Sequence, residues 1–299
     1  MAETAATPAL GIDRLSRPPE SQLRLAWRSF RRNRLAVAGG VVLLLLYVVA
    51  LFAPVLAPYD YRAFNPGQPL KPPSAQHWMG TDRQTRDVFS RVLVGSRVSL
   101  AVGFAAVSLI MLIGITLGAV AGYLGGVVDN VIMRLTDIML AIPLLFLLIA
   151  AAALFTPGIR TTVIVIGFTS WMTTARLVRG EFLRLKALDY VLAARALGAS
   201  TPRIMARHLL PNALPAIIVQ ATLWLSYAIL LESSLSFLGL GVQPPTPSWG
   251  NMLADGRVDM RIGWWVAVFP GMAIFVTVLA FNLVGDGLRD AFDPWRRER

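Results

Sequence analysis

Few residues in this chain of 299 residues are of the kinds that bind metals or carry out catalysis. It has no cysteine, which excludes a thiol nucleophile, a zinc finger and an iron–sulfur cluster. Its two lysines, Lys71 and Lys186, stand in LKP and LKA rather than in a phosphate-binding loop of the GxxxxGK type. Its two histidines, His77 and His208, are 131 positions apart and lack a carboxylate partner at helical spacing, which argues against a metal or hydrolytic site. We therefore expect no enzyme, and no ATP or other cofactor bound by this chain.

Glu232 is the acidic residue that lies deepest in an apolar stretch, LLESSLSFLG. A carboxylate within a membrane is costly, so it should face a partner, the interior of a helix bundle or water. It would then either line a path for a solute or form a structural hydrogen bond with Ser233, Ser234 or an adjacent helix. Asp137 lies nearer the end of its stretch, and Arg134 one turn earlier favours a local ion pair.

The composition predicts that these residues are held by helices in a membrane. Hydrophobic residues make up 56% of the chain and charged residues 15%, whereas a soluble domain carries about 25% charged residues. Five uncharged stretches are each long enough to cross ~30 Å of hydrocarbon as a helix, namely 35–56, 99–124, 138–159, 209–231 and 262–285. A sixth, 161–175, reaches that length if Arg176 and Arg179 extend to the interface. We expect an all-α polytopic membrane protein with about six transmembrane helices.

The distribution of basic residues predicts how these helices are oriented. The net charge is +11, and 19 of the 28 basic residues fall on the side that holds both termini. The positive-inside rule therefore places both termini in the cytoplasm and the chain in the cell membrane. A basic balance can also indicate a nucleic-acid binder, but the long apolar runs favour arginines that face anionic lipid, so lipid and not nucleic acid is the expected partner.

The segments outside the spans differ in character. Residues 1–22 are expected to be disordered, and 23–57 to form a short amphipathic helix followed by an anchor helix that is retained rather than cleaved as a signal peptide. Leu23, Trp27 and Phe30 would share one side of that first helix, although its arginines could equally act as a simple positive stop before the span. The outer loop 58–97 is irregular and proline-rich at first, and Thr81–Asp82 then favours a helix start. Residues 291–299 form the last cytoplasmic tail.

Two glycine-containing features predict how helices approach one another or a partner. Gly114, Gly118 and Gly122 lie four positions apart, so one helix face is nearly bare and another helix can pack closely. Gly198 is expected to end a helix over 189–197, after which Thr201 would serve as the N-cap of a second helix.

The segment 189–211 therefore reads as a helix–turn–helix elbow that projects from the membrane. Arg203 and Arg207 lie one turn apart on it, and Pro211 stands where the next span begins. Such an elbow suits docking onto another protein. The alternative is an ordinary loop, but a loop between helices needs only a few residues.

This elbow resembles the EAA loop of ABC-importer permeases, in which a coupling helix sits in a groove of a cytoplasmic ATPase. The resemblance is carried by Ala193–Ala194, then Gly198, then Leu210–Pro211. The family's glutamate position is Leu192 here, which removes one possible ion pair with the ATPase. The resemblance implies an ATPase-coupling elbow made by Ala193, Ala194, Gly198, Arg203, Arg207, Leu210 and Pro211.

Further segments resemble the C-type permease subunit of dipeptide and oligopeptide importers. They include RNRLAVAGGVVLLLL, HWMGTDRQTRDVFSRVLVGSRVSL, LSFLGLGVQPPTPSWGNML and FNLVGDGLRDAFDP, and together the matching segments cover roughly 24–295. At Thr85 that subfamily usually has glycine. The resemblance implies a permease transmembrane domain over 98–290, a homologous second permease, two ATPase subunits that use ATP, and an extracytoplasmic substrate-binding protein. Its commonest cargo is peptide, although nickel chelates, glutathione, oligosaccharides and other solutes use closely similar permeases.

Two other functional classes make different demands on the sequence. A self-contained secondary transporter or channel would be expected to have inverted repeats, interrupted spans and buried acids, and the chain shows no clear repeat and one deep acid. A membrane-embedded hydrolase would need paired histidines or acids within the spans, and these are absent.

Overall fold

Helices form nearly all of the regular structure in residues 22–64 and 69–292, which are the residues that the computed structural model describes. The expected all-α fold is thus confirmed for that part of the chain. The expected disordered tail over 1–22 lies outside the described residues except for Gln22, and the tail over 291–299 does so except for its first two residues.

Four continuous helices are long and apolar enough to cross a membrane. They are α2 (Arg34–Leu56), α3 (Val88–Leu124), α10 (Leu210–Phe237) and α12 (Trp265–Phe292). Two further candidate spans are bent pairs: α4 (Gly126–Ala141) with α5 (Leu144–Ala153), at 90°, and α6 (Ile159–Ser170) with α7 (Met172–Leu185), at 44°. Counting each bent pair as one span gives the six that the sequence predicts.

The third span departs from the straight helix expected over 138–159. Gly125 and Gly126 turn the chain sharply with φ of +70° and +57°, so α4 already begins at Gly126 and Ile138 lies in its last turns. Pro143 then interrupts the helix, because it has no N–H to donate and its ring clashes with the preceding turn. The fourth span similarly breaks at Trp171 and continues to Leu185, well past the expected end.

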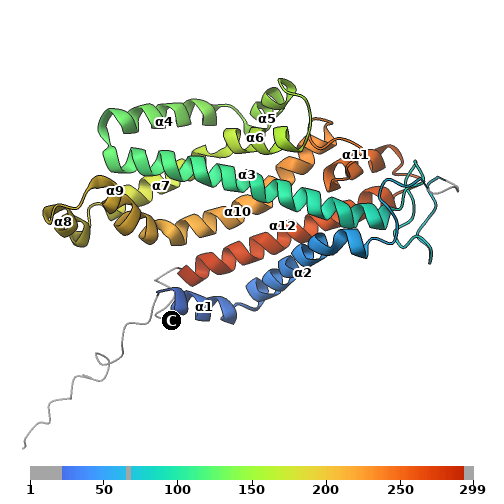
Figure 1. The fold of residues 1–299 in the computed structure, drawn as a ribbon, viewed down its shortest axis with the longest axis horizontal. Coiled ribbons are helices and arrows are strands. Elements are labelled where there is room, and N and C mark those ends of the chain that lie inside the picture. Colours follow the sequence, from blue (N-terminus) through green and yellow to red (C-terminus); the bar gives the residue numbers. More distant parts are fainter. Residues whose placement is uncertain (1–21, 65–68, 293–299) are drawn as a thin grey trace, which may run out of the picture.

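The helices run lengthwise through the molecule, and their ends gather into two regions (Figure 1). We call the region with α1 (Gln22–Arg32), α8 (Asp189–Ala196) and the end of α12 the elbow end. The opposite region, with segments 57–64 and 69–87 and helix α11 (Trp249–Val258), is the loop end. The first and last described helices thus reach the same side, as six spans require.

Helix α1 matches the amphipathic helix expected before the first span. It packs against α12 and is joined to α2 by Asn33, whose side chain caps α2 by accepting a hydrogen bond from the Ala36 N–H. Trp27 stacks on Phe30 and is largely exposed, while Ala26 is buried. The side chain of Leu23 lies outside the described part of the structure.

The glycine face of α3 packs closely against α7, as the four-residue spacing predicts. A Cβ on Gly114 would lie 2.6 Å from Cβ of Thr174, and one on Gly122 would lie 2.8 Å from the carbonyl oxygen of Arg179. Gly118 likewise has the backbone of Ala175 directly against it. Any side chain at these three positions would push the two helices apart.

At the loop end, α3 begins six residues later than Thr81–Asp82 would place it. The Asp82 carboxylate accepts hydrogen bonds from the N–H groups of Gln84 and Arg86, which form a turn rather than a helix. Asp87 is the N-cap instead, accepting from the Ser90 N–H at 2.8 Å. Helix α11 begins directly after the prolines Pro244, Pro245 and Pro247. It is started by a reciprocal capping pair between Ser248 and Asn251.

Candidate functional site

The elbow consists of two short helices joined by a left-handed glycine. Helix α8 ends at Ala196, and Gly198 follows with φ of +83°, a backbone conformation that residues with a Cβ rarely adopt. In helix α9 (Thr201–Ile204) the N-cap position is held by Ser200, without a capping hydrogen bond from its side chain, and the expected cap Thr201 is already in the first turn. A π-helical turn, Met205–Leu209, leads into α10, which Leu210 and Pro211 begin.

Three apolar side chains fix the elbow to the rest of the chain. Val191, Ile204 and Leu209 are fully or almost fully buried and pack in one cluster with Phe182 and Leu185 of α7. Tyr190 and His208 lie with their rings 6.4 Å apart at the base of the elbow. His208 thus lies by the elbow, and no group of three or more possible metal ligands is found among the described residues.

The remaining surface of the elbow is apolar and basic, and the described chain leaves it open. Leu197 is 88% exposed and Leu192, at the family's glutamate position, is 48% exposed. Arg203 and Arg207 are exposed and form no ion pair with another described residue. The predicted docking residues Ala193, Gly198 and Pro211 are exposed as well, whereas Ala194 and Leu210 are half-buried.

Glu232 lies at a buried junction of three helices. Its carboxylate accepts hydrogen bonds from the Ser99 hydroxyl of α3 at 3.0 Å and from Ser236 at 2.8 Å, with Ser233 at 3.5 Å. The Ser99 hydroxyl oxygen also accepts a hydrogen bond from the backbone N–H of Trp249, which joins the network to α11. The bonds to Ser233 and to an adjacent helix match the structural interpretation, and the path-lining role of Glu232 stays a prediction.

The expected pair between Asp137 and Arg134 is wrong. The Asp137 carboxylate instead accepts from Arg176, at 2.5 Å, and Asp129 accepts from Arg179 at 2.5 and 2.6 Å. Both bonds join α4 to α7, so these arginines hold one bent span to the other. His77 also has a carboxylate partner that spacing did not predict: its Nδ1 lies 2.8 Å from Asp87.

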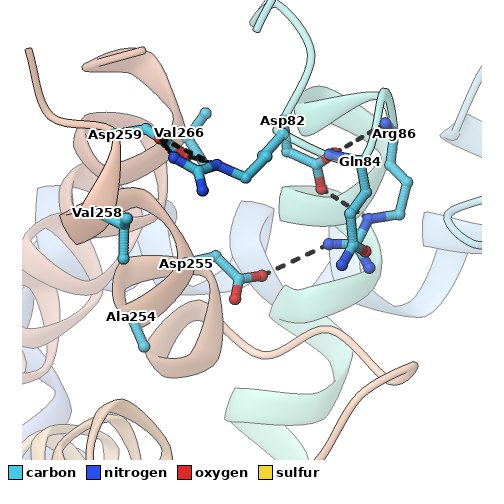
Figure 2. Close-up of a pocket in the computed structure, with 9 residues that line it drawn as sticks. Asp82, Gln84, Arg86, Ala254, Asp255, Val258, Asp259 and Val266 are labelled. Carbon is cyan, nitrogen blue, oxygen red and sulfur yellow. Dashed lines mark hydrogen bonds and ion pairs between the residues drawn. The ribbon is translucent and has the colours of Figure 1, made fainter. Parts of the chain in front are cut away.

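A charge cluster at the loop end was missed from the sequence. Figure 2 shows Asp82 and Arg86 facing Asp255 of α11 across a cavity of about 190 Å³. Asp82 accepts from Arg86 Nε at 2.6 Å, and Asp255 lies 3.5 Å from Arg86 and 3.6 Å from Arg91. The i, i+4 spacing of Asp82 and Arg86 was the available signal.

Burial and pairing act in opposite directions on the acids of this cluster. Burial raises the pKa of Asp255, and the nearby Arg91 and Arg86 oppose that rise. The hydrogen bond to Asp259 raises the pKa of Arg83 above its ordinary value. The cluster therefore ties the segment before α3 to α11 with charges that neutralise one another.

Comparisons with known proteins match almost the whole chain. Residues 114–298 match the family described as "Binding-protein-dependent transport system inner membrane component", and 21–73 match the N-terminal transmembrane domain of oligopeptide transport permease C. The dipeptide transport system permease protein DppC of Bacillus subtilis is 45% identical over 283 residues, covering 94% of this chain and 88% of that protein. The glutathione transport system permease protein GsiD of Pectobacterium atrosepticum is 47% identical over 274 residues, covering 90% of this chain and 89% of that protein.

Solved structures of lower identity share the fold. An inward-facing crystal structure of the MetNI methionine ABC transporter superposes with a TM-score of 0.56 at 20% identity, covering 68% of this chain and 97% of that one. A crystal structure of an amino acid ABC transporter gives a TM-score of 0.51 at 17% identity, covering 71% and 95% of the two chains. At such identities the likeness concerns the arrangement of helices alone.

Proposed function

The chain belongs to the family of binding-protein-dependent transport system inner membrane components, and from that premise we propose that it forms half of a membrane path for short peptides or similar small solutes. The family consists of multi-pass permeases of ABC transporters, so the chain is a transport component and not an enzyme. The open apolar and basic surface of the elbow is the observation that carries the proposal. A membrane protein that works alone has no need of such a surface outside the lipid.

The elbow is the docking point for an ATPase subunit in this proposal. Leu197, Arg203 and Arg207 would be covered by the partner, while buried Val191 and Ile204 hold the elbow rigid enough to transmit a displacement. ATP is used by two such cytoplasmic subunits and not by this chain, which has no phosphate-binding loop. A homologous second permease supplies the other half of the path, and a substrate-binding protein delivers the cargo from outside.

The proposed orientation places the elbow end and both termini in the cytoplasm. It rests on the excess of basic residues on that side. The loop end then faces the substrate-binding protein. The cargo proposal rests on the relatives named for dipeptide and oligopeptide transport, and on glutathione being itself a small peptide.

Two interrupted spans are present, which is one feature expected of a self-contained secondary transporter. Family membership outweighs this feature, because the interruptions occur in a chain that matches ABC permeases over nearly its full length. In the proposed function, the two interrupted spans form part of the half of the transport path that this subunit contributes.

Reconstitution in liposomes tests the proposal. The chain alone should neither turn over ATP nor take up radiolabelled Ala–Ala, whereas addition of its second permease, ATPases and loaded binding protein should produce both activities. Robust uptake by the single chain would contradict the subunit role. Identifying the ligand carried by the cognate binding protein would decide the cargo separately.

A further inference from the structure

A second cavity, of about 150 Å³, lies where the two bent spans break. Its wall comes from the corner between α4 and α5 at Pro143, from the break between α6 and α7 beside Ser170, and from Trp224 of α10. One water needs ~15 Å³ by the same measure of volume, so the space is larger than a packing defect. It is separate from the loop-end cavity and from the junction around Glu232.

Two residues in this wall have polar atoms without a partner. Ser170 and Trp224 are more than nine-tenths buried, and neither the Ser170 Oγ nor the Trp224 Nε1 has a hydrogen-bond partner in the described structure. Buried polar groups are paired in the great majority of cases, so two unpaired groups from residues of one cavity wall indicate an occupant.

The chemistry of the wall restricts what that occupant can be. An indole N–H only donates, whereas a serine hydroxyl both donates and accepts. No charged side chain lines the cavity, and Met139 and Met172 give it an adaptable apolar surface. A neutral group with a carbonyl oxygen and an N–H satisfies both polar atoms, and a peptide unit is such a group.

We propose that this cavity is a subsite on the transport path that binds one peptide group of the passing cargo, an inference that rests on the proposed function. The cavity holds a part of a dipeptide and not the whole of it. Both polar atoms are themselves inaccessible to solvent, so the residues of the cavity wall must move before the cargo can contact these atoms. The breaks beside Pro143 and Trp171 allow this, because continuous hydrogen-bond ladders do not brace the helices there.

Transport by the assembled complex with its binding protein tests the subsite, with Ala–Ala as the probe. Trp224→Phe keeps an aromatic side chain, although a smaller one, and removes the N–H, and Ser170→Ala removes the hydroxyl. The number of peptides transported per ATP should fall about fivefold in each, as the loss of one hydrogen bond of about 1 kcal/mol predicts. Ser108→Ala is the matched control, since the Ser108 hydroxyl is exposed on α3 and bonds only to its own helix. An unchanged ratio in both wall variants would overturn the subsite.

A chain without cysteine also permits a direct measurement of access. Ser170→Cys in the assembled complex should react with methyl methanethiosulfonate, read from the mass of this subunit. Ala–Ala-loaded binding protein during turnover should slow that reaction, and should leave Ser108→Cys unaffected. A Ser170→Cys variant that reacts at the same rate with and without cargo contradicts the subsite, even where the transport variants assemble poorly.

The two proposals fail in different ways. If the unmodified complex does not take up Ala–Ala, the peptide cargo is wrong. The subsite is then judged by access alone: a Ser170→Cys variant that stays unreactive at rest and during ATP turnover overturns it, whereas one that reacts only during turnover supports a cavity on the path.

Discussion

The two ends of this molecule treat their charges in opposite ways. At the loop end, Asp82, Arg86 and Arg91 are buried and lie within 4 Å of opposite charges, and Arg83 is paired with Asp259. At the elbow end, Arg203 and Arg207 stand exposed without an ion pair to another described residue. The loop end therefore holds its own shape, and the elbow presents charge to a partner.

The apolar core of the loop end also differs from the elbow, although Trp78 and Val258 at the surface of the loop end are each 66% exposed. Val88, Met252 and Trp265 pack together at the loop end and are almost entirely buried. On the elbow, Leu197 is nearly bare and Leu192 is half-exposed. A soluble surface seldom leaves such residues uncovered beside unpaired arginines, so the difference supports the proposed interface with an ATPase at the elbow.

The most direct test of this contrast compares two glycines of the same conformation. Gly198 of the elbow and Gly239 of the loop end have φ of +83° and +79°, and a Cβ on either meets no atom within 4 Å. Arginine at either position costs about 1–2 kcal/mol of backbone strain. Gly198→Arg should also reduce co-purification of the ATPase about tenfold or more, corresponding to ~1.4 kcal/mol or more of binding.

Gly239→Arg is the matched control and should retain the ATPase. Membrane insertion of both variants should persist, because neither residue lies within a span. If both variants retain the ATPase equally and Gly198→Arg shows normal uptake, the elbow is not the docking point for the ATPase.

The next effect concerns the stability of the loop end. Asp82→Asn removes the buried charge that faces Arg86 and Arg91, which should lower the free energy of unfolding by about 3–5 kcal/mol. Arg203→Ala at the elbow should change it by less than about 0.5 kcal/mol, because that side chain is exposed and unpaired. Thermal unfolding of the purified variants in one detergent measures both. Similar losses in the two would contradict the contrast between the ends.

Glu232 should have a smaller effect, whose form distinguishes its two roles. Glu232→Leu leaves the hydroxyls of Ser99 and Ser236 without their acceptor and should cost about 1–3 kcal/mol in thermal stability. Glu232→Gln keeps an acceptor and should be nearly silent in the structural role. If Glu232 instead lines the path, the glutamine variant should lose uptake of cationic cargo more than uptake of neutral cargo while assembly stays intact.

The smallest effect is a gain at Thr85, where the related subfamily usually has glycine. Thr85 has φ of +62°, a left-handed conformation that is unfavourable for a β-branched residue. Thr85→Gly relieves that strain and loses some of the gain to the greater freedom of the unfolded chain, so a net stabilisation of about 0.5–1 kcal/mol is expected. Thr85→Ala retains a Cβ and should gain less. A destabilised glycine variant would show that the threonine side chain has a role of its own.

Long apolar runs and small-residue patterns were sufficient to predict the spans and the elbow. Length alone determines that α2, α3, α10 and α12 can cross the membrane. The glycine at 198 marks a helix end because few other residues adopt its conformation. Both features are determined by residues that are close together in the chain, so they can be predicted from a single sequence.

Features that depend on distant neighbours could not be read in this way. Arg176 selects Asp137 because the two helices meet, and nothing in the spacing of Arg134 and Asp137 reveals that competition. Helix α3 starts later than the sequence predicts because the Asp82 carboxylate already accepts hydrogen bonds from the Arg86 side chain and from two backbone N–H groups. Asp87 therefore serves as the N-cap. The partners of Glu232 come from α3 as well as from its own helix, and α11 had to be placed before Ser99 could be linked to Trp249.

The length of α3 has a mechanical consequence for the whole assembly. Its 37 residues form one unbroken rod of about 55 Å, anchored at the loop end by Asp87 and clamped against α7 by its glycine face near the elbow. A tilt of about 5° about one end would carry the other end about 5 Å, close to one turn of helix. In the proposed function, a push on the elbow by an ATPase would therefore reach the loop end of the molecule as a displacement of about one helical turn, because α3 has no break in between.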